Sequence, residues 1–130
     1  MTFTVEYSEK FSEEFVRFPE DQQLKVAAFA LLFQTHGLGD FSKYEGKITP
    51  SWQGLAPSDQ AYVYASSNSL WHYHIGHPAY TQSIGPYKTS DWVLHFQWVG
   101  KGPKITLVDM YAHYTTKGDF YLPPPSYLGT

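Results

Sequence analysis

The chain contains no cysteine among its 130 residues. Disulfide bonds, thiolate metal ligands and a cysteine nucleophile are therefore excluded. It also lacks a run of about 18 apolar residues, so we expect no membrane-spanning helix. The N-terminal segment has neither the basic stretch nor the long apolar stretch of a signal peptide, and we do not expect it to be one. These absences suit a reducing compartment, and we expect the protein to be cytoplasmic.

Positive charge is scarce as well. Arg17 is the only arginine, and the formal net charge is −3. Non-specific binding of duplex nucleic acid normally uses many lysine and arginine contacts with phosphate, so this composition argues against it. The charge is uneven, because residues 61–130 carry four bases, three acids and five of the six histidines. Protonated histidines would make that half of the chain cationic.

Aromatic side chains are abundant. They make up 18% of the residues, within a hydrophobic share of 42%. A chain of this length and composition fits one domain with its own core. We therefore predict a single domain over residues 1–130, with a proline-rich tail at 122–130 that cannot join the centre of a sheet.

Apolar periodicity predicts the N-terminal elements. Alternation at residues 3–7 indicates a strand. Phenylalanines then recur at helical spacing, and a second apolar stripe follows Pro19. The first stripe is Phe11, Phe15 and Phe18, and the second is Leu24, Ala27, Ala28, Leu31 and Leu32. Residues 9–36 should therefore form a helical hairpin.

Most of the remaining chain is typical of strands. Runs at 61–65 and 70–75, joined by a short polar turn, predict a β-hairpin. Further strands are predicted at 91–99 and 104–111, with a short edge strand within 43–48. Because the connections are short, the sheet should be mainly antiparallel. The expected fold class is α+β, with the first strand and the helical hairpin packed on this sheet.

Histidines gather on one predicted face of that sheet. Along 70–75, Trp71, Tyr73 and Ile75 share one face, which leaves the histidines between them on the other. If the apolar faces pack on the helices, the imidazoles line the exposed side, where their ordinary pKa suits proton transfer. The alternative is that each histidine is an ordinary hydrogen-bonded residue. The set comprises His72, His74, His77, His95 and His113.

Three functions fit this pattern. The first is general acid–base cleavage of RNA, in which a base takes a proton from the ribose 2′-hydroxyl and an acid protonates the leaving oxygen. The second is a metal site, with His72 and His74 on one side of a strand and His77 or His95 as the third ligand. The third is a binding module in which the aromatic residues form only core and surface contacts.

Three segments carry a resemblance to a known family. The opening TFTVEYSEKFSEEFVRFPEDQQLKVAAFALLFQTHG is similar to the first strand and helical hairpin of the RelE/ParE toxin superfamily. The segment LWHYHIG resembles its central strand, with His74 at the usual arginine position. The segment KITLVDMYAHYTTKGDFY resembles its final strand and catalytic end.

This resemblance implies a RelE-like fold and a bacterial type II toxin–antitoxin system. The toxin would cleave mRNA, often on the ribosome, and a cognate antitoxin protein would neutralise it. We accordingly expect metal-independent catalysis without a metal or small-molecule cofactor. The alternative is a non-enzymatic interaction protein, such as an immunity or antitoxin-like inhibitor of a nuclease.

The resemblance and the residue pattern together define the expected site. His74 and His113 are the acid–base candidates, and His95 and Lys117 would stabilise phosphate charge. Tyr114 and Tyr121 would stack on bases or orient the RNA backbone. Further RNA contacts are expected from His72, His77, Tyr111 and Lys47.

Overall fold

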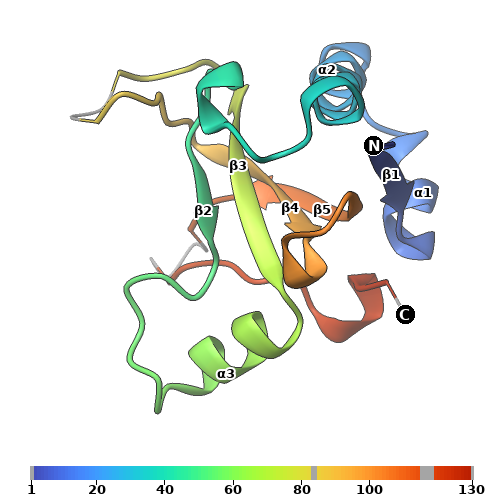
Figure 1. The fold of residues 1–130 in the computed structure, drawn as a ribbon. Coiled ribbons are helices and arrows are strands. Elements are labelled where there is room, and N and C mark those ends of the chain that lie inside the picture. The colour runs from blue at the N-terminus through green and yellow to red at the C-terminus, as the bar shows by residue number, and fades with distance from the viewer. Residues whose placement is uncertain (1, 83–84, 115–118, 130) are drawn as a thin grey trace.

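A five-stranded sheet forms the centre of the protein in the computed structural model, which describes residues 2–82, 85–114 and 119–129. The helices are α1 (Glu9–Phe15), α2 (Glu20–His36) and α3 (Gln60–Ser67). The strands are β1 (Thr4–Tyr7), β2 (Ile48–Pro50), β3 (Leu70–His77), β4 (Trp92–Gln97) and β5 (Lys104–Ala112). In Figure 1, α1 and α2 lie together beside β1, whereas α3 lies at the other end of the molecule.

The strand order is β1-β5-β4-β3-β2. The pairs β2–β3, β3–β4 and β4–β5 are antiparallel, and only β1 runs parallel to its neighbour β5. The predicted α+β class with a mainly antiparallel sheet is therefore confirmed. Among the described residues, no helix has both the length and the apolar character needed to cross a membrane.

The N-terminal helices begin and end at the expected signals. Ser8 caps α1, because its hydroxyl accepts a hydrogen bond from the Phe11 backbone N–H at 3.3 Å. Pro19 separates the two helices, and α2 ends at Gly37, whose φ of 64° favours glycine. A side chain at Gly37 would also meet the ring of Phe3. The helical hairpin predicted over residues 9–36 is thus confirmed.

The buried face of α2 differs from the prediction. Leu24 and Leu31 are 62% and 64% exposed, so most of the predicted leucine and alanine stripe is wrong. Of its members, Leu32 is partly buried and packs against the core. The helix instead turns Val26, Phe29 and Phe33 inward. Two phenylalanines one turn apart bury more apolar area than the leucines would, and this difference decides which face packs on the sheet.

The core lies between these helices and one face of the sheet. Phe29 stacks on Tyr73 of β3 with ring centroids 4.6 Å apart, and Trp71 meets Trp98 at 4.9 Å. The predicted inward direction of Trp71, Tyr73 and Ile75 is confirmed, because all three belong to the main buried cluster. The odd-numbered positions of β3 therefore fill the core, and the even-numbered positions face the other way.

The predicted hairpin of 61–65 with 70–75 is wrong. Residues 60–67 form α3, which Asp59 caps by accepting a hydrogen bond from the Ala61 backbone N–H at 2.9 Å. Ala65 is fully buried, and the Tyr64 hydroxyl donates to the Pro123 carbonyl oxygen at 2.6 Å. The cap and these contacts outweigh the strand preference of a tyrosine- and valine-rich run.

The strand β3 pairs instead with β4 and with the short edge strand β2. That edge strand spans Ile48–Pro50, so it overlaps the predicted range 43–48 only at Ile48. Gly46 precedes it and forms only an isolated bridge to Lys88. A Cβ atom at Gly46 would lie 1.8 Å from the His74 carbonyl oxygen, so the backbone approaches β3 too closely there for a side chain.

We predict that Phe29→Ala lowers the free energy of unfolding by about 3–5 kcal/mol, because it leaves a cavity between α2 and β3. Leu24→Ala in the same helix removes an exposed side chain and should change it by less than about 0.5 kcal/mol. Urea denaturation of both variants measures the difference. Equal losses of unfolding free energy in the two variants would show that α2 does not pack on the sheet through Val26, Phe29 and Phe33.

Candidate functional site

The second face of the sheet carries a row of polar side chains. Thr49 of β2, His72 of β3, His95 of β4 and Asp109 of β5 are successive cross-strand partners. Side chains paired in this way lie on the same face, so the row crosses four strands. His74 follows His72 on that face, one step along β3.

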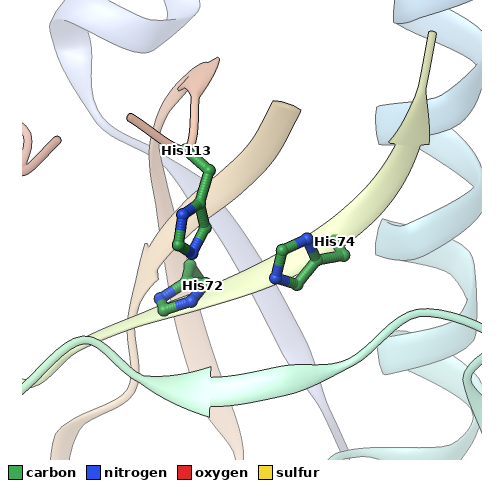
Figure 2. Close-up of side chains that lie close together, drawn as sticks. All are labelled: His72, His74 and His113. Atoms are coloured by element: carbon green, nitrogen blue, oxygen red, sulfur yellow. The ribbon is translucent and has the colours of Figure 1, made fainter. Parts of the chain in front are cut away.

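Three histidines of this face come together (Figure 2). His72 and His74 come from β3, and His113 directly follows β5. The ring centroids of His113 lie 5.2 Å from those of His72 and 5.1 Å from those of His74. One potential ligand atom of each residue lies within 4.8 Å of those of the other two. We call His72, His74 and His113 the histidine cluster.

Hydrogen bonds orient the cluster. His72 Nδ1 lies 2.9 Å from the Ser51 hydroxyl oxygen. His74 Nδ1 lies 2.9 Å from the Ser90 carbonyl oxygen, and it also faces the Ser90 backbone N–H, which donates to it at 3.0 Å. In the tautomer whose Nδ1–H donates to these oxygens, Nε2 of each ring has a free lone pair. In the other tautomer of His74, Nδ1 accepts from the Ser90 backbone N–H and Nε2 carries the proton. His113 Nδ1 is buried without a hydrogen-bond partner in the described part of the chain.

The cluster opens into a pocket of about 830 Å³. Its walls come from the segment after β2, from the segment before β4 and from the end of β5. They contain several hydroxyl groups, one lysine and one aspartate. The principal lining residues are Lys47, Thr49, Ser51, Thr81, Thr89, Asp91, Tyr114 and Phe120, together with the histidine cluster.

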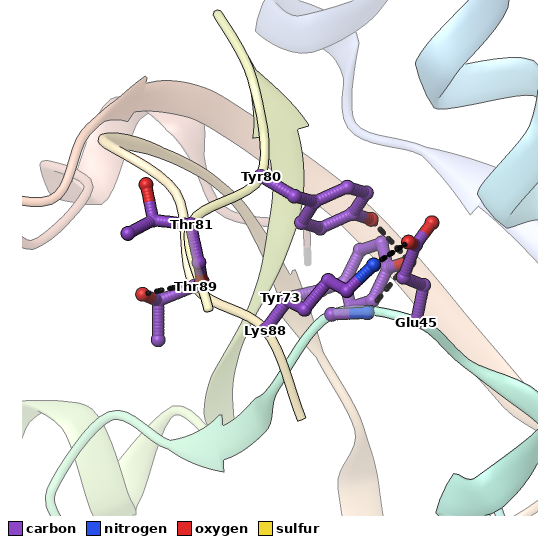
Figure 3. A network of polar contacts seen from close by, with 7 residues as sticks. Glu45, Tyr73, Tyr80, Thr81, Lys88 and Thr89 are labelled. Atoms are coloured by element: carbon purple, nitrogen blue, oxygen red, sulfur yellow. Dashed lines mark hydrogen bonds and ion pairs between the residues drawn. The ribbon is translucent and has the colours of Figure 1, made fainter. Parts of the chain in front are cut away.

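Polar contacts fix the wall formed by the segment before β4 (Figure 3). The hydroxyls of Tyr73 and Tyr80 are hydrogen-bonded at 2.9 Å, and Lys88 forms an ion pair with Glu45 at 2.7 Å. Thr81 and Thr89 form an antiparallel bridge within the segment. These contacts attach the wall to both β3 and the chain that leads into β2.

The imidazoles are held in their neutral form. Burial lowers the pKa of His72, His74 and His113, and the positive charge of neighbouring groups lowers each further. The pKa of His113 falls to about 4. Neutral imidazoles at neutral pH are suited to bind a metal ion and are poorly suited to act as general acids.

His95 lies beneath the pocket and does not line it. It is fully buried, neither ring nitrogen has a hydrogen-bond partner among the described residues, and its pKa is lowered to about 3, mainly by burial. The ring of Tyr121 covers it with a centroid distance of 5.6 Å. The expected role of His95 in stabilising phosphate charge is therefore wrong, because a neutral buried ring cannot reach a substrate.

Tyr121 belongs to the same buried layer. Its hydroxyl donates a hydrogen bond to the Asp109 carboxylate. Burial raises the pKa of Asp109 to about 6, although this bond opposes the rise. Tyr121 does not line the pocket, so its expected contact with RNA is not supported by its position.

Two other residues expected at the site, His77 and Tyr111, lie outside the pocket. His77 lies away from the cluster, next to Trp92 at 5.4 Å and to Gln22 of α2. A register shift between His74 and His77 turns it to that side. Tyr111 packs on Tyr121 with tilted rings whose centroids are 4.4 Å apart, outside the pocket lining.

Besides the histidine cluster, two more expected residues line the pocket, and one expected residue cannot be placed. Tyr114 is 60% exposed and packs on His113 at 4.4 Å, and Lys47 lines the wall. Lys117 lies outside the described residues. Ser51 and Ser90 were missed by the sequence analysis, because no local pattern marks a serine as the partner of a histidine about twenty positions away.

The comparisons with known proteins gave no match. No protein-family model, no curated protein and no solved structure matches the chain. Function therefore has to be inferred from the pocket itself.

We predict that acid destabilises the protein in the presence of a metal chelator. The histidine pKa values lie below that of the unfolded chain, so their stabilising effect is present above pH 6.5 and is lost as the pH falls toward about 4. Asp109 has the opposite effect on the free energy of unfolding, since its raised pKa favours the folded state at low pH. This single carboxyl group is outweighed by the four histidines with lowered pKa, which are His72, His74, His95 and His113.

The variant His95→Leu should flatten this pH dependence between pH 6 and pH 4 by roughly 1 kcal/mol per pH unit. His36→Leu is the control, because His36 is exposed in the last turn of α2. Urea denaturation at a series of pH values provides the measurement. If His95→Leu leaves the change of unfolding free energy with pH as it is in the wild type, His95 is not a buried, neutral ring in the folded protein.

Proposed function

We propose that the protein is a metal-dependent hydrolase that holds one divalent transition-metal ion with His72, His74 and His113. The supporting observation is the convergence of their ligand atoms within 4.8 Å at the floor of an open pocket. Of the alternatives raised by the sequence, the metal site fits this geometry best. Its third ligand is His113, in place of His77 or His95.

The number and type of ligands favour a catalytic site. Structural zinc sites have four protein ligands, whereas catalytic sites have three and leave one position for water or substrate. The serine contacts to the Nδ1 atoms of His72 and His74 match the outer hydrogen bonds that orient metal-binding histidines. Nitrogens bound to zinc at about 2.0–2.1 Å lie closer together than 4.8 Å, so small side-chain rotations complete the site.

The reaction class follows from such an ion and from the pocket. An ion with an open position lowers the pKa of a coordinated water and so supplies hydroxide near neutral pH. Hydrolysis then adds hydroxide to the electrophilic atom of the substrate and a proton to the leaving group. The pocket of about 830 Å³ falls in the size range of small-molecule sites.

We predict that protein purified without an affinity tag binds one equivalent of zinc. His72→Ala and His113→Ala should each weaken zinc binding by at least about tenfold, because each removes one of three ligands. His77→Ala is the matched control, since it removes a histidine of the same strand that lies away from the cluster. Isothermal titration calorimetry and metal analysis test this, and equal zinc binding by all four proteins would contradict the proposed site.

Metal-independent RNA cleavage by a RelE/ParE-type toxin is the second candidate. It is favoured by the presence of His74, His113, Tyr114 and Lys47 at one pocket. It requires one of these histidines to be protonated, which the lowered pKa values oppose. For this reason it ranks below the metal-dependent reaction.

Induced expression in a bacterial host separates the two candidates. A toxin would stop growth and degrade mRNA, His113→Ala would relieve both effects, and cleavage by the purified protein would continue in the presence of a chelator. We expect the contrary for a metal-dependent hydrolase, whose activity the chelator removes. Chelator-resistant RNA cleavage would therefore replace the first proposal with the second.

A further inference from the structure

Lys47 is held beside the histidine cluster by backbone hydrogen bonds. Its carbonyl oxygen accepts from the His74 backbone N–H at 3.0 Å, and its own N–H donates to the Lys88 carbonyl oxygen at 2.8 Å. These bonds pair it with β3 at the position of His74. Cross-strand partners project to the same side of a sheet, so the side chain of Lys47 enters the pocket.

The ammonium group of Lys47 has no ion-pair partner among the described residues. Lys88 and Lys104, by contrast, pair with Glu45 and Glu6 at 2.7 Å and 3.3 Å. The side chain of Lys47 lines the same pocket as His72, His74 and His113. Asp91 is the one carboxylate in the described lining, and it lies beyond ion-pair distance of Lys47.

The pocket thus places one lysine next to the three histidines that could hold a metal ion. With a divalent ion bound, two centres of positive charge would face the same space, and one aspartate would not neutralise them. The hydroxyls of Thr49 and Thr81 add hydrogen-bond donors around that space, whereas the Thr89 hydroxyl donates to the Thr81 carbonyl oxygen at 3.5 Å. Such a surface favours an anion with several oxygen atoms.

We propose that the substrate is a phosphate ester whose anionic oxygens bind between the metal ion and Lys47. This inference rests on the proposed metal-dependent hydrolase and names its substrate class. A carboxylic ester is uncharged at its reacting carbon, whereas a phosphate ester carries negative charge on the oxygens of its reacting phosphorus. A cation fixed beside the metal ligands therefore stabilises a phosphate ester both when it binds and in the transition state.

The reaction is a hydrolysis in which water supplies both new groups. The hydroxide oxygen forms a bond to phosphorus, and the bond between phosphorus and the leaving oxygen breaks. The leaving oxygen takes up the proton that the water released when it became hydroxide, directly or through solvent. The products are an alcohol and either a phosphate or a phosphate monoester, and no oxidant or further reactant is needed.

The test uses the full chain loaded with zinc and three chromogenic substrates. These are p-nitrophenyl phosphate, bis(p-nitrophenyl) phosphate and the uncharged p-nitrophenyl acetate. We expect hydrolysis of at least one phosphate ester, and the pair distinguishes a monoesterase from a diesterase. Lys47→Gln should lower kcat/KM for that ester by about tenfold or more relative to acetate, because it removes a charged hydrogen bond.

A binding measurement gives a second readout that does not depend on turnover. Inorganic phosphate should bind to the zinc-loaded wild-type protein in a calorimetric titration, and Lys47→Gln should weaken this binding by about tenfold. Lys104→Gln is the control, because it removes an exposed lysine that is ion-paired with Glu6 and lies outside the pocket lining. It should bind phosphate as the wild type does.

The two proposals fail in different ways. Absence of zinc binding would overturn the metal-dependent function and this inference with it. Zinc binding with hydrolysis of acetate alone, or equal losses for phosphate ester and acetate in Lys47→Gln, would overturn only the assignment to phosphate esters. Phosphate binding that Lys47→Gln leaves unchanged would have the same meaning.

Discussion

The two-residue period of β3 is the constraint on which the rest of the structure depends. It sends Trp71 and Tyr73 into the core under α2 and His72 and His74 to the opposite face. Because the core side is tightly packed, β3 cannot slip by one residue without exchanging aromatic and imidazole side chains. The packing of α2 on one face therefore also fixes the positions of His72 and His74 on the opposite face. The pairing of β4 with β5 brings His113 to the same side.

This arrangement has a cost in stability. Imidazoles that are buried and unpaired lose hydration, and His95 and His113 have ring nitrogens with no partner among the described residues. A metal ion would satisfy the cluster at His113, and because it would bind only the folded chain it would also stabilise the fold. His95 gains nothing directly from such an ion.

The sequence predicted those features that depend on local periodicity. The helical hairpin, the strands around residues 70–75 and 104–111 and the direction of Trp71, Tyr73, His72 and His74 follow from spacing alone. Features that depend on competition between distant contacts were not predictable. The run at 61–65 has strand-forming residues, but the Asp59 cap and the contact of Tyr64 with Pro123 make it a helix. Likewise, the choice of His113 over His77 depends on a register shift in β3 that no local pattern reveals.

The central claim is that three imidazoles bind one metal ion. Anomalous diffraction from crystals of untagged protein grown with zinc tests it most directly. We predict a single strong peak in the pocket, about 2.0–2.1 Å from one nitrogen each of His72, His74 and His113, with a fourth position open to solvent. A map without a peak among these residues, or with zinc bound only at His36 or His77, would contradict the account.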